Sequence, residues 1–140
     1  MYNPATDLQQ ILTRLREDPQ IRTLLNLTSD DTVGAYERVI GTKVYWDYTD
    51  MTPRIAAYYR PSRTLDNQMV IQQNFEVVAN VPNTNVFLAY ELLTRAKELL
   101  CDPEFTIRNQ RIHFAGDIGE LPAAVGFFAA ASRLFYYRSI

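Results

Sequence analysis

The chain has 140 residues, enough for one domain that buries a hydrophobic core without disulfide or metal support. Its 47% hydrophobic and 21% charged residues exclude a largely disordered chain. A formal net charge of −2 argues against a DNA-binding protein with a basic stripe. The single cysteine, Cys101, excludes an intramolecular disulfide, and we expect neither a secretory signal nor a membrane span.

The N-terminal residues predict two helices. Thr6 and Gln9 have the spacing of a capping box, and an apolar stripe with helical periodicity follows them. Asp18-Pro19 is typical of an N-cap followed by proline at the first helical position, so a short second helix is expected next. The apolar residues of the two helices are Leu8, Ile11, Leu12, Leu15, Ile21, Leu24, Leu25 and Leu27.

Residues 28–52 give a weaker pattern. The stretch SDDT predicts a turn or a helix cap, and GAYERVIG fits either a short helix or a strand. The aromatic stretch KVYWDYTDM, residues 43–51, is expected to be irregular.

Two strands are predicted after Pro53. The first is RIAAYYR, and the polar stretch PSRTLDN then forms a loop. The second, QMVIQQNFEVVANV, alternates between an apolar side and a polar side, which favours antiparallel pairing with one wet face. Gln73 interrupts the apolar side and suggests a bulge or an edge position. The polar side comprises Gln72, Asn74, Glu76 and Asn80.

A long helix follows, capped within Pro82-Asn83-Thr84 and ended by Asp102-Pro103. Its broad apolar face is suited to covering a sheet, and Glu91 and Arg95 have the spacing of an i,i+4 ion pair.

The C-terminal third predicts strands. FTI and RIHFA flank a hairpin turn at residues 108–110, and GDIGELP is expected to be a loop. The alanines of AAVGFFAAASRLFYYR are compatible with a helix, but its Phe and Tyr residues and the preceding Pro122 favour a central strand. The chain is therefore expected to be a single α+β domain over residues 1–140. Its sheet, mixed or mainly antiparallel, would have about four strands, with helices packed mainly on one face.

Residues with catalytic chemistry are sparse. Cys101 and His113 are the only thiol and imidazole, but Cys101 ends an apolar helix face and His113 lies in a strand pattern. The acidic pairs of the sequence are better explained as caps and loop residues than as metal ligands. We therefore expect no enzyme, no cofactor and no metal.

An interface is the preferred interpretation of the one basic and aromatic cluster, which comprises Arg54, Tyr58, Tyr59, Arg60 and Arg63. Such a cluster suits either nucleic acid or protein, and the net acidic charge favours protein. The candidate subunit-interface residues lie in this cluster and in the PSRTLDN and GDIGELP stretches. They are Arg54, Tyr58, Arg60, Arg63, Asp66, Asp117 and Glu120.

Four stretches of the chain resemble the small neck and tail-completion proteins of long-tailed bacteriophages, the tail-terminator or tail-to-head joining group. They are LQQILTRLREDPQIRTLLNL, PRIAAYYRP, MVIQQNFEVVANVPNTNVFLAYELLTRAKELL and FFAAASRLFYY. The likeness is one of layout and covers most of the chain, whereas the length and aromatic content of residues 28–52 depart from it.

This resemblance implies a virion protein, assembled in the host cytoplasm, that forms a homo-hexameric ring. The ring would end the tail tube and join the tail-tube protein to the head-side connector, and DNA would pass through it without specific binding. A head-closure or minor capsid protein of the same neck is a close alternative. A small monomeric protein-binding module is an alternative of another class, and an enzyme is the least favoured.

Overall fold

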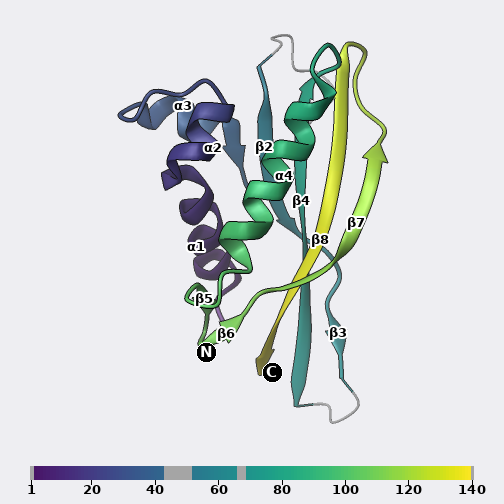
Figure 1. The fold of residues 1–140 in the computed structure, drawn as a ribbon. Coiled ribbons are helices and arrows are strands. Elements are labelled where there is room, and N and C mark those ends of the chain that lie inside the picture. Colours follow the sequence, from purple (N-terminus) through teal and green to yellow (C-terminus); the bar gives the residue numbers. More distant parts are fainter. Residues whose placement is uncertain (1, 43–51, 66–68, 140) are drawn as a thin grey trace.

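A computed structural model describes residues 2–42, 52–65 and 69–139, and within these ranges the chain is an α+β protein (Figure 1). The helices are α1 (Pro4–Glu17), α2 (Pro19–Leu24), α3 (Thr32–Arg38) and α4 (Val86–Leu100). The strands are β1 (Val39–Ile40), β2 (Arg54–Tyr59), β3 (Arg63–Thr64), β4 (Val70–Pro82), β5 (Thr106–Ile107), β6 (Gln110–Arg111), β7 (His113–Leu121) and β8 (Phe127–Ser139).

The main sheet has six strands, so the expectation of about four strands was too low. Its order is β1-β2-β4-β8-β7, with β3 also paired to β4, and β5 and β6 form a separate ribbon. The sheet is mixed because β1 runs parallel to β2 while the other pairs are antiparallel. The two extra strands, β1 and β3, have two residues each, too few for an alternating pattern to be visible in the sequence.

The pair β4–β8 forms the centre of the sheet. Each strand has 13 residues, and they pair without a register shift from Val70 opposite Ser139 to Pro82 opposite Phe127. The alanine-rich C-terminal stretch is therefore a central strand, as its aromatic residues predicted. Gln73 pairs opposite Tyr136 within this regular ladder, so it marks no bulge between β4 and β8. On the other side of β4 it falls between the residues paired with β3 and those paired with β2.

Helix α1 has the predicted apolar stripe but a different cap. Its N-cap is Asn3, whose side chain accepts a hydrogen bond from the Thr6 N–H, and Pro4 occupies the first helical position. The predicted capping box of Thr6 and Gln9 was wrong because both residues lie inside the helix. Asn3-Pro4 repeats the cap-then-proline signal of Asp18-Pro19, which does begin α2 as predicted. Residues 32–40 form α3 and then β1, so both interpretations of GAYERVIG hold in part.

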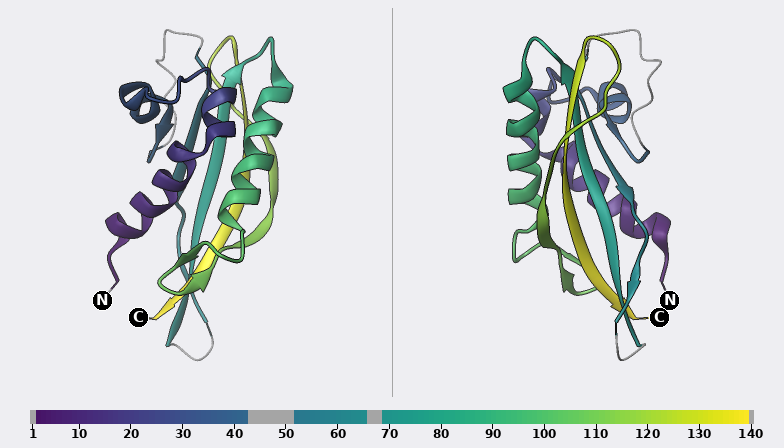
Figure 2. Two further views of the ribbon diagram at one scale, coloured as in Figure 1. Left: turned by 60° about the vertical axis from the view of Figure 1, so that its left-hand side comes forward. Right: turned by 90° about the vertical axis from the view of Figure 1, so that its right-hand side faces the viewer.

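The helices lie on one side of the sheet (Figures 1 and 2). Helix α4 packs on β4 and β8, and α1 packs beside α4 and against β2. Alternate residues of the central strands, among them Phe75 and Leu134, point into this layer and are fully buried. The apolar stripes of α1 and α4 cover them, which is the arrangement that the helical periodicity predicted.

Arg95 of α4 connects this helix to the start of α2. Its guanidinium donates two hydrogen bonds to the buried Asp18 carboxylate, at 3.0 and 2.7 Å, and Asp18 also caps α2. A third N–H reaches Glu98 at 3.1 Å. Arg95 therefore pairs with Asp18 and Glu98, whereas the sequence suggested Glu91. Burial opposes ionisation of Asp18, but the hydrogen bonds from Arg95 and from the backbone prevail and lower the pKa of Asp18 below its ordinary value.

A polar network lies beneath α1 on the helix side of the sheet. Asp7, 2% exposed, accepts hydrogen bonds from the Tyr136 hydroxyl at 2.9 Å and from Arg108 Nε at 3.1 Å. The Tyr59 hydroxyl donates to the carbonyl of Pro4 at 2.7 Å. A buried carboxylate is costly unless it is paired and hydrogen-bonded, so this network holds the start of α1 in one position on the sheet.

Two stretches expected to be loops contain strands. PSRTLDN contains β3, and GDIGELP lies mostly in β7, the edge strand beside β8. Register shifts flank Gly116 and Gly119, and both glycines have positive φ angles. Bulged edge strands use glycine at such positions, so a stretch that resembles a turn in the sequence is a twisted strand. The aromatic stretch 43–51 lies outside the described residues.

Replacing Asp18 tests the connection between α2 and α4. Asp18→Asn keeps a good helix cap but removes the charge that Arg95 binds, so the free energy of unfolding is expected to fall by about 1 to 2 kcal/mol. Urea denaturation at neutral pH measures this loss. Glu98→Gln is the matched control, because Glu98 binds the same guanidinium from an exposed position and its loss is expected to cost less than about 0.5 kcal/mol.

The same pair predicts a pH dependence. Since the pKa of Asp18 is lower in the folded chain than the ordinary 3.8, its stabilisation is complete above the unfolded pKa and is lost as the pH falls through the folded value. The stability difference between the natural chain and Asp18→Asn should therefore be constant above about pH 5 and shrink in more acidic solution. A difference that grows on acidification would contradict the pairing.

Adjacent tyrosines test the network beneath α1. Tyr136→Phe removes a buried donor to Asp7, and we expect a loss of about 1 to 2 kcal/mol in the free energy of unfolding. Tyr137→Phe is the control, because Tyr137 lies on the opposite side of β8 and its hydroxyl has no hydrogen-bond partner among the described residues. Its expected cost is below about 0.5 kcal/mol, and equal effects of both changes would contradict the network.

Candidate functional site

The candidate site lies on the side of the sheet that faces away from the helix layer, here named the open face. The described helices pack their buried apolar residues into the core on the other side of the sheet, where they meet Phe75 and Leu134. The turn between β7 and β8 packs over one end of it, where Ala123 and Leu121 contact the buried Val78, Ala129 and Ala131. The rest of the open face carries polar, charged and aromatic side chains.

Four side chains of the open face form one cluster. Cross-strand pairing places Tyr58, Glu76 and Arg133 side by side on β2, β4 and β8. The Tyr58 hydroxyl donates to Glu76 Oε2 at 3.0 Å, and Arg133 Nη2 donates to Oε1 at 3.2 Å. Arg60 Nε lies 3.2 Å from the same Oε1, an ion-pair contact without hydrogen-bond alignment. We name these four residues the Glu76 cluster.

Glu76 is buried while its two arginines are not. Its side chain is 7% exposed, compared with 38% for Arg60 and 48% for Arg133. The buried carboxylate needs these partners, but exposed guanidiniums contribute little to stability because water screens them. Only one nitrogen of each guanidinium contacts Glu76, and among the described residues their other N–H groups are available to an anionic group of a partner. The pKa of Tyr58 is raised to about 12, mainly because the hydroxyl is buried and secondly because the negative Glu76 carboxylate lies beside it.

Aromatic rings extend the open face beyond the cluster. The His113 ring stacks on Phe135 at a centroid distance of 5.2 Å, and Phe135 meets Tyr137 edge-on at 5.4 Å. We name these three rings the aromatic row. Arg63 on β3 pairs opposite Gln72, which places its exposed side chain on the same side of the sheet. Arginine and aromatic side chains together are typical of protein–protein interfaces.

The predicted interface residues are distributed over the molecule. Tyr58 and Arg60 meet in the Glu76 cluster and Arg63 lies on the same face, whereas Asp66 is outside the described residues. Arg54, predicted to present its charge, is only 5% exposed and donates to the Thr52 carbonyl at 3.3 Å.

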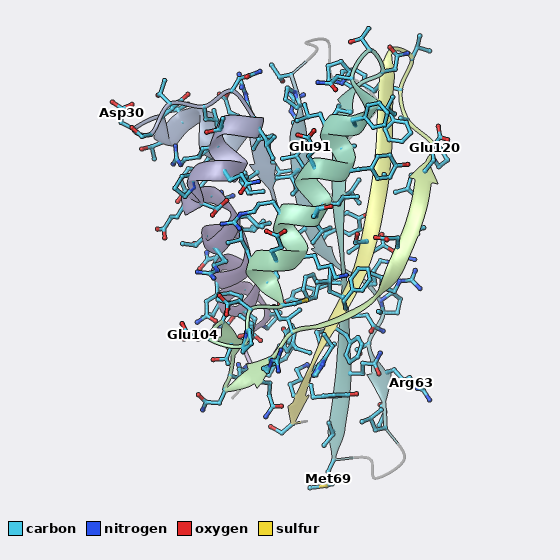
Figure 3. All side chains as sticks on the ribbon, in the orientation of Figure 1. Asp30, Arg63, Met69, Glu91, Glu104 and Glu120 are labelled. Atoms are coloured by element: carbon cyan, nitrogen blue, oxygen red, sulfur yellow. The ribbon has the colours of Figure 1, made fainter. Side chains whose placement is uncertain are left out.

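The two acidic candidates, Asp117 and Glu120, lie on the edge strand β7, away from the cluster. Asp117 accepts a hydrogen bond from Ser132 at 2.8 Å. Figure 3 shows Glu120 and Arg63 far apart along the sheet.

Glu76 and Arg133 were missed by the sequence interpretation. Glu76 was expected only as one of the residues on the polar side of its strand, and the sequence pattern did not single out Arg133. The sequence did contain a signal for this pairing, because a glutamate at the centre of a long strand is costly to bury unless a cationic side chain pairs with it. The partner could not be identified because Arg133 is 57 residues away, and only the register of β4 and β8 brings the two together.

The two residues considered for catalysis are Cys101, which packs against the hydrophobic core, and His113. Burial raises the pKa of the Cys101 thiol, which disfavours the nucleophilic thiolate. His113 is exposed and takes part in the aromatic row. In the described part of the chain, no three or more His, Cys, Asp and Glu residues are grouped to hold a metal, and no helix has the length and apolarity needed to cross a membrane.

Comparison with known proteins gives no assignment: no family model matches the chain, and no curated protein matches it significantly.

The Glu76 cluster predicts a specific tyrosine titration. In Glu76→Gln the negative charge beside the Tyr58 hydroxyl is removed, so the pKa of Tyr58 should fall from about 12 but stay above the ordinary 10.0, because burial remains. NMR of chains labelled with ¹³C at the tyrosine Cζ measures it, with Tyr58→Phe identifying the resonance. Glu120→Gln is the control and should leave the titration unchanged. An unaltered Tyr58 pKa in Glu76→Gln would rule out the contact.

Proposed function

We propose that this chain is a structural subunit of the head–tail junction of a long-tailed bacteriophage. In this role it forms a ring that ends the tail tube and joins the tube to the head-side connector, and its work is assembly rather than bond chemistry. The observation that carries the proposal is the open face, an arginine-rich and aromatic surface on the side of a regular sheet that faces away from the helix layer.

Two features of the open face support a docking role. Its backbone is held by long, regular pairing of β4 with β8, so its side chains are presented on a rigid support and lose little freedom on binding. Its arginines are partly exposed around a single buried carboxylate, which leaves a surplus of positive charge for contact with another subunit.

The resemblance to the tail-completion group supplies the identity of the assembly. A ring requires each subunit to use two different surfaces, one for each neighbour. DNA would pass through the ring without specific binding, and a chain with a net charge of −2 has little excess positive charge to retain it.

The solution mass tests this proposal. Light scattering over a range of concentrations, on the chain alone and mixed with isolated phage tails, should reveal a species of about six times 16.2 kDa. Tails lacking their terminal ring are the matched control, since they should capture the chain while complete tails should not. A chain that stays monomeric and ignores both kinds of tail would overturn the proposal and favour a monomeric protein-binding module.

A further inference from the structure

A second surface lies on the opposite side of the molecule, between α2 and α4. It is a groove of about 480 Å³, and Phe87, Tyr90, Glu91 and Glu98 are among the residues that line it. Figure 3 shows Glu91 on the helix side of the sheet, facing away from the open face. We name this surface the α2–α4 groove.

The α2–α4 groove is both apolar and acidic. Phe87 is 76% exposed and Tyr90 is 47% exposed, which is unusual for large rings on a helix that otherwise buries its apolar residues. Arg95 also lines the groove, where it binds both the buried Asp18 carboxylate and Glu98. Its single positive charge is outnumbered by Asp18, Glu91 and Glu98, so this region carries a net negative charge.

The two surfaces are complementary in charge and in composition. The open face presents Arg60, Arg63 and Arg133 beside Phe135 and Tyr137, with Glu76 as the carboxylate of the cluster. The groove presents glutamates beside exposed aromatic rings. A partner with the chemistry of the groove would satisfy the free guanidinium N–H groups and bury the rings of both surfaces.

The symmetry of association follows from this complementarity. In a two-fold contact each surface meets a copy of itself, which would place arginines against arginines or glutamates against glutamates. A head-to-tail contact instead joins the open face of one copy to the groove of the next. Because the two surfaces lie on opposite sides of the sheet, every copy in a head-to-tail series can use both of them.

We propose that a second copy of this chain occupies the open face, with its α2–α4 groove seated against Arg60, Arg63 and Arg133 and with Phe87 packed on the aromatic row. This inference rests on the proposed function, since it names the contact that would build the ring. The bulges of β7 are consistent with it, because they disfavour the alternative of continuous strand pairing between copies at that edge.

Mixing two charge-reversed variants tests the contact. Arg63→Glu makes the open face more acidic and Glu91→Arg makes the groove basic, so each variant alone should self-associate about tenfold more weakly than the natural chain. An equimolar mixture should recover association to within about threefold, because each altered surface then meets an opposite charge on its neighbour. Sedimentation velocity at low salt measures all three samples, in the presence of tails if the natural chain assembles only there.

Controls separate this contact from general effects of charge. Glu104→Arg and Arg111→Glu reverse exposed charges outside both surfaces and should leave association unchanged. Arg63→Ala and Glu91→Ala are milder variants for use if circular dichroism shows that a reversal unfolds the chain, and each should weaken association about threefold.

The outcomes distinguish the contact from the function. If the natural chain assembles neither alone nor on tails, the proposed function fails. If it assembles and the reversals have no effect, or if mixing does not restore association, only this contact is overturned. A third outcome is that the natural chain binds a single-stranded oligonucleotide and that Arg63→Glu abolishes this binding but still self-associates normally. This result would also overturn the proposed contact and would assign the open face to nucleic acid.

Discussion

The pairing of β4 with β8 is the constraint on which the rest of the structure depends. These two strands have 13 residues each and pair along their full length. Their register determines which side chains lie next to one another on each side of the sheet. A shift by one residue would move every side chain of a strand to the opposite side of the sheet. In the observed register, Phe75 and Leu134 face the helices together while Glu76 and Arg133 face away together.

The helix side of this pair is completed by apolar packing and by a few buried polar contacts. The contact of Asp18 with Arg95 joins the start of α2 to α4, and that of Asp7 with Tyr136 joins α1 to β8. Apolar stripes bring helices and sheet together without directional preference, whereas these hydrogen bonds are satisfied in only one arrangement. Their role is therefore to position the helices, and the apolar core supplies most of the stabilisation.

The open face uses its buried charge in a different way. On the helix side the buried Asp7 and Asp18 bind partners from other elements, whereas Glu76 lies on the open face and binds two arginines that are themselves partly exposed. Arg60 and Arg133 each neutralise Glu76 through one nitrogen, and the rest of each guanidinium remains partly exposed to solvent. This arrangement lets the sheet keep a locally basic surface, although the whole chain carries a net negative charge.

Local sequence signals determined much of the fold. The stripes of α1 and α4, the cap at Asp18-Pro19 and the strands β2 and β4 were all predictable, because each depends on residues close together in the chain. The turn predicted at residues 108–110 is present, but Gln110 already belongs to β6. The glycines of β7 misled the interpretation, since a bulged edge strand and a turn use the same residues for the same positive φ angles.

For the site, the sequence by itself determined which residue types are present, namely arginines and tyrosines after Pro53 and a polar side of β4. The tertiary structure decided their use. It buried Arg54, joined Tyr58 and Arg60 to Glu76, and added Arg133 from the far end of the chain. The physical reason is that partners across a sheet are set by strand order and register, which depend on contacts between residues distant in the sequence.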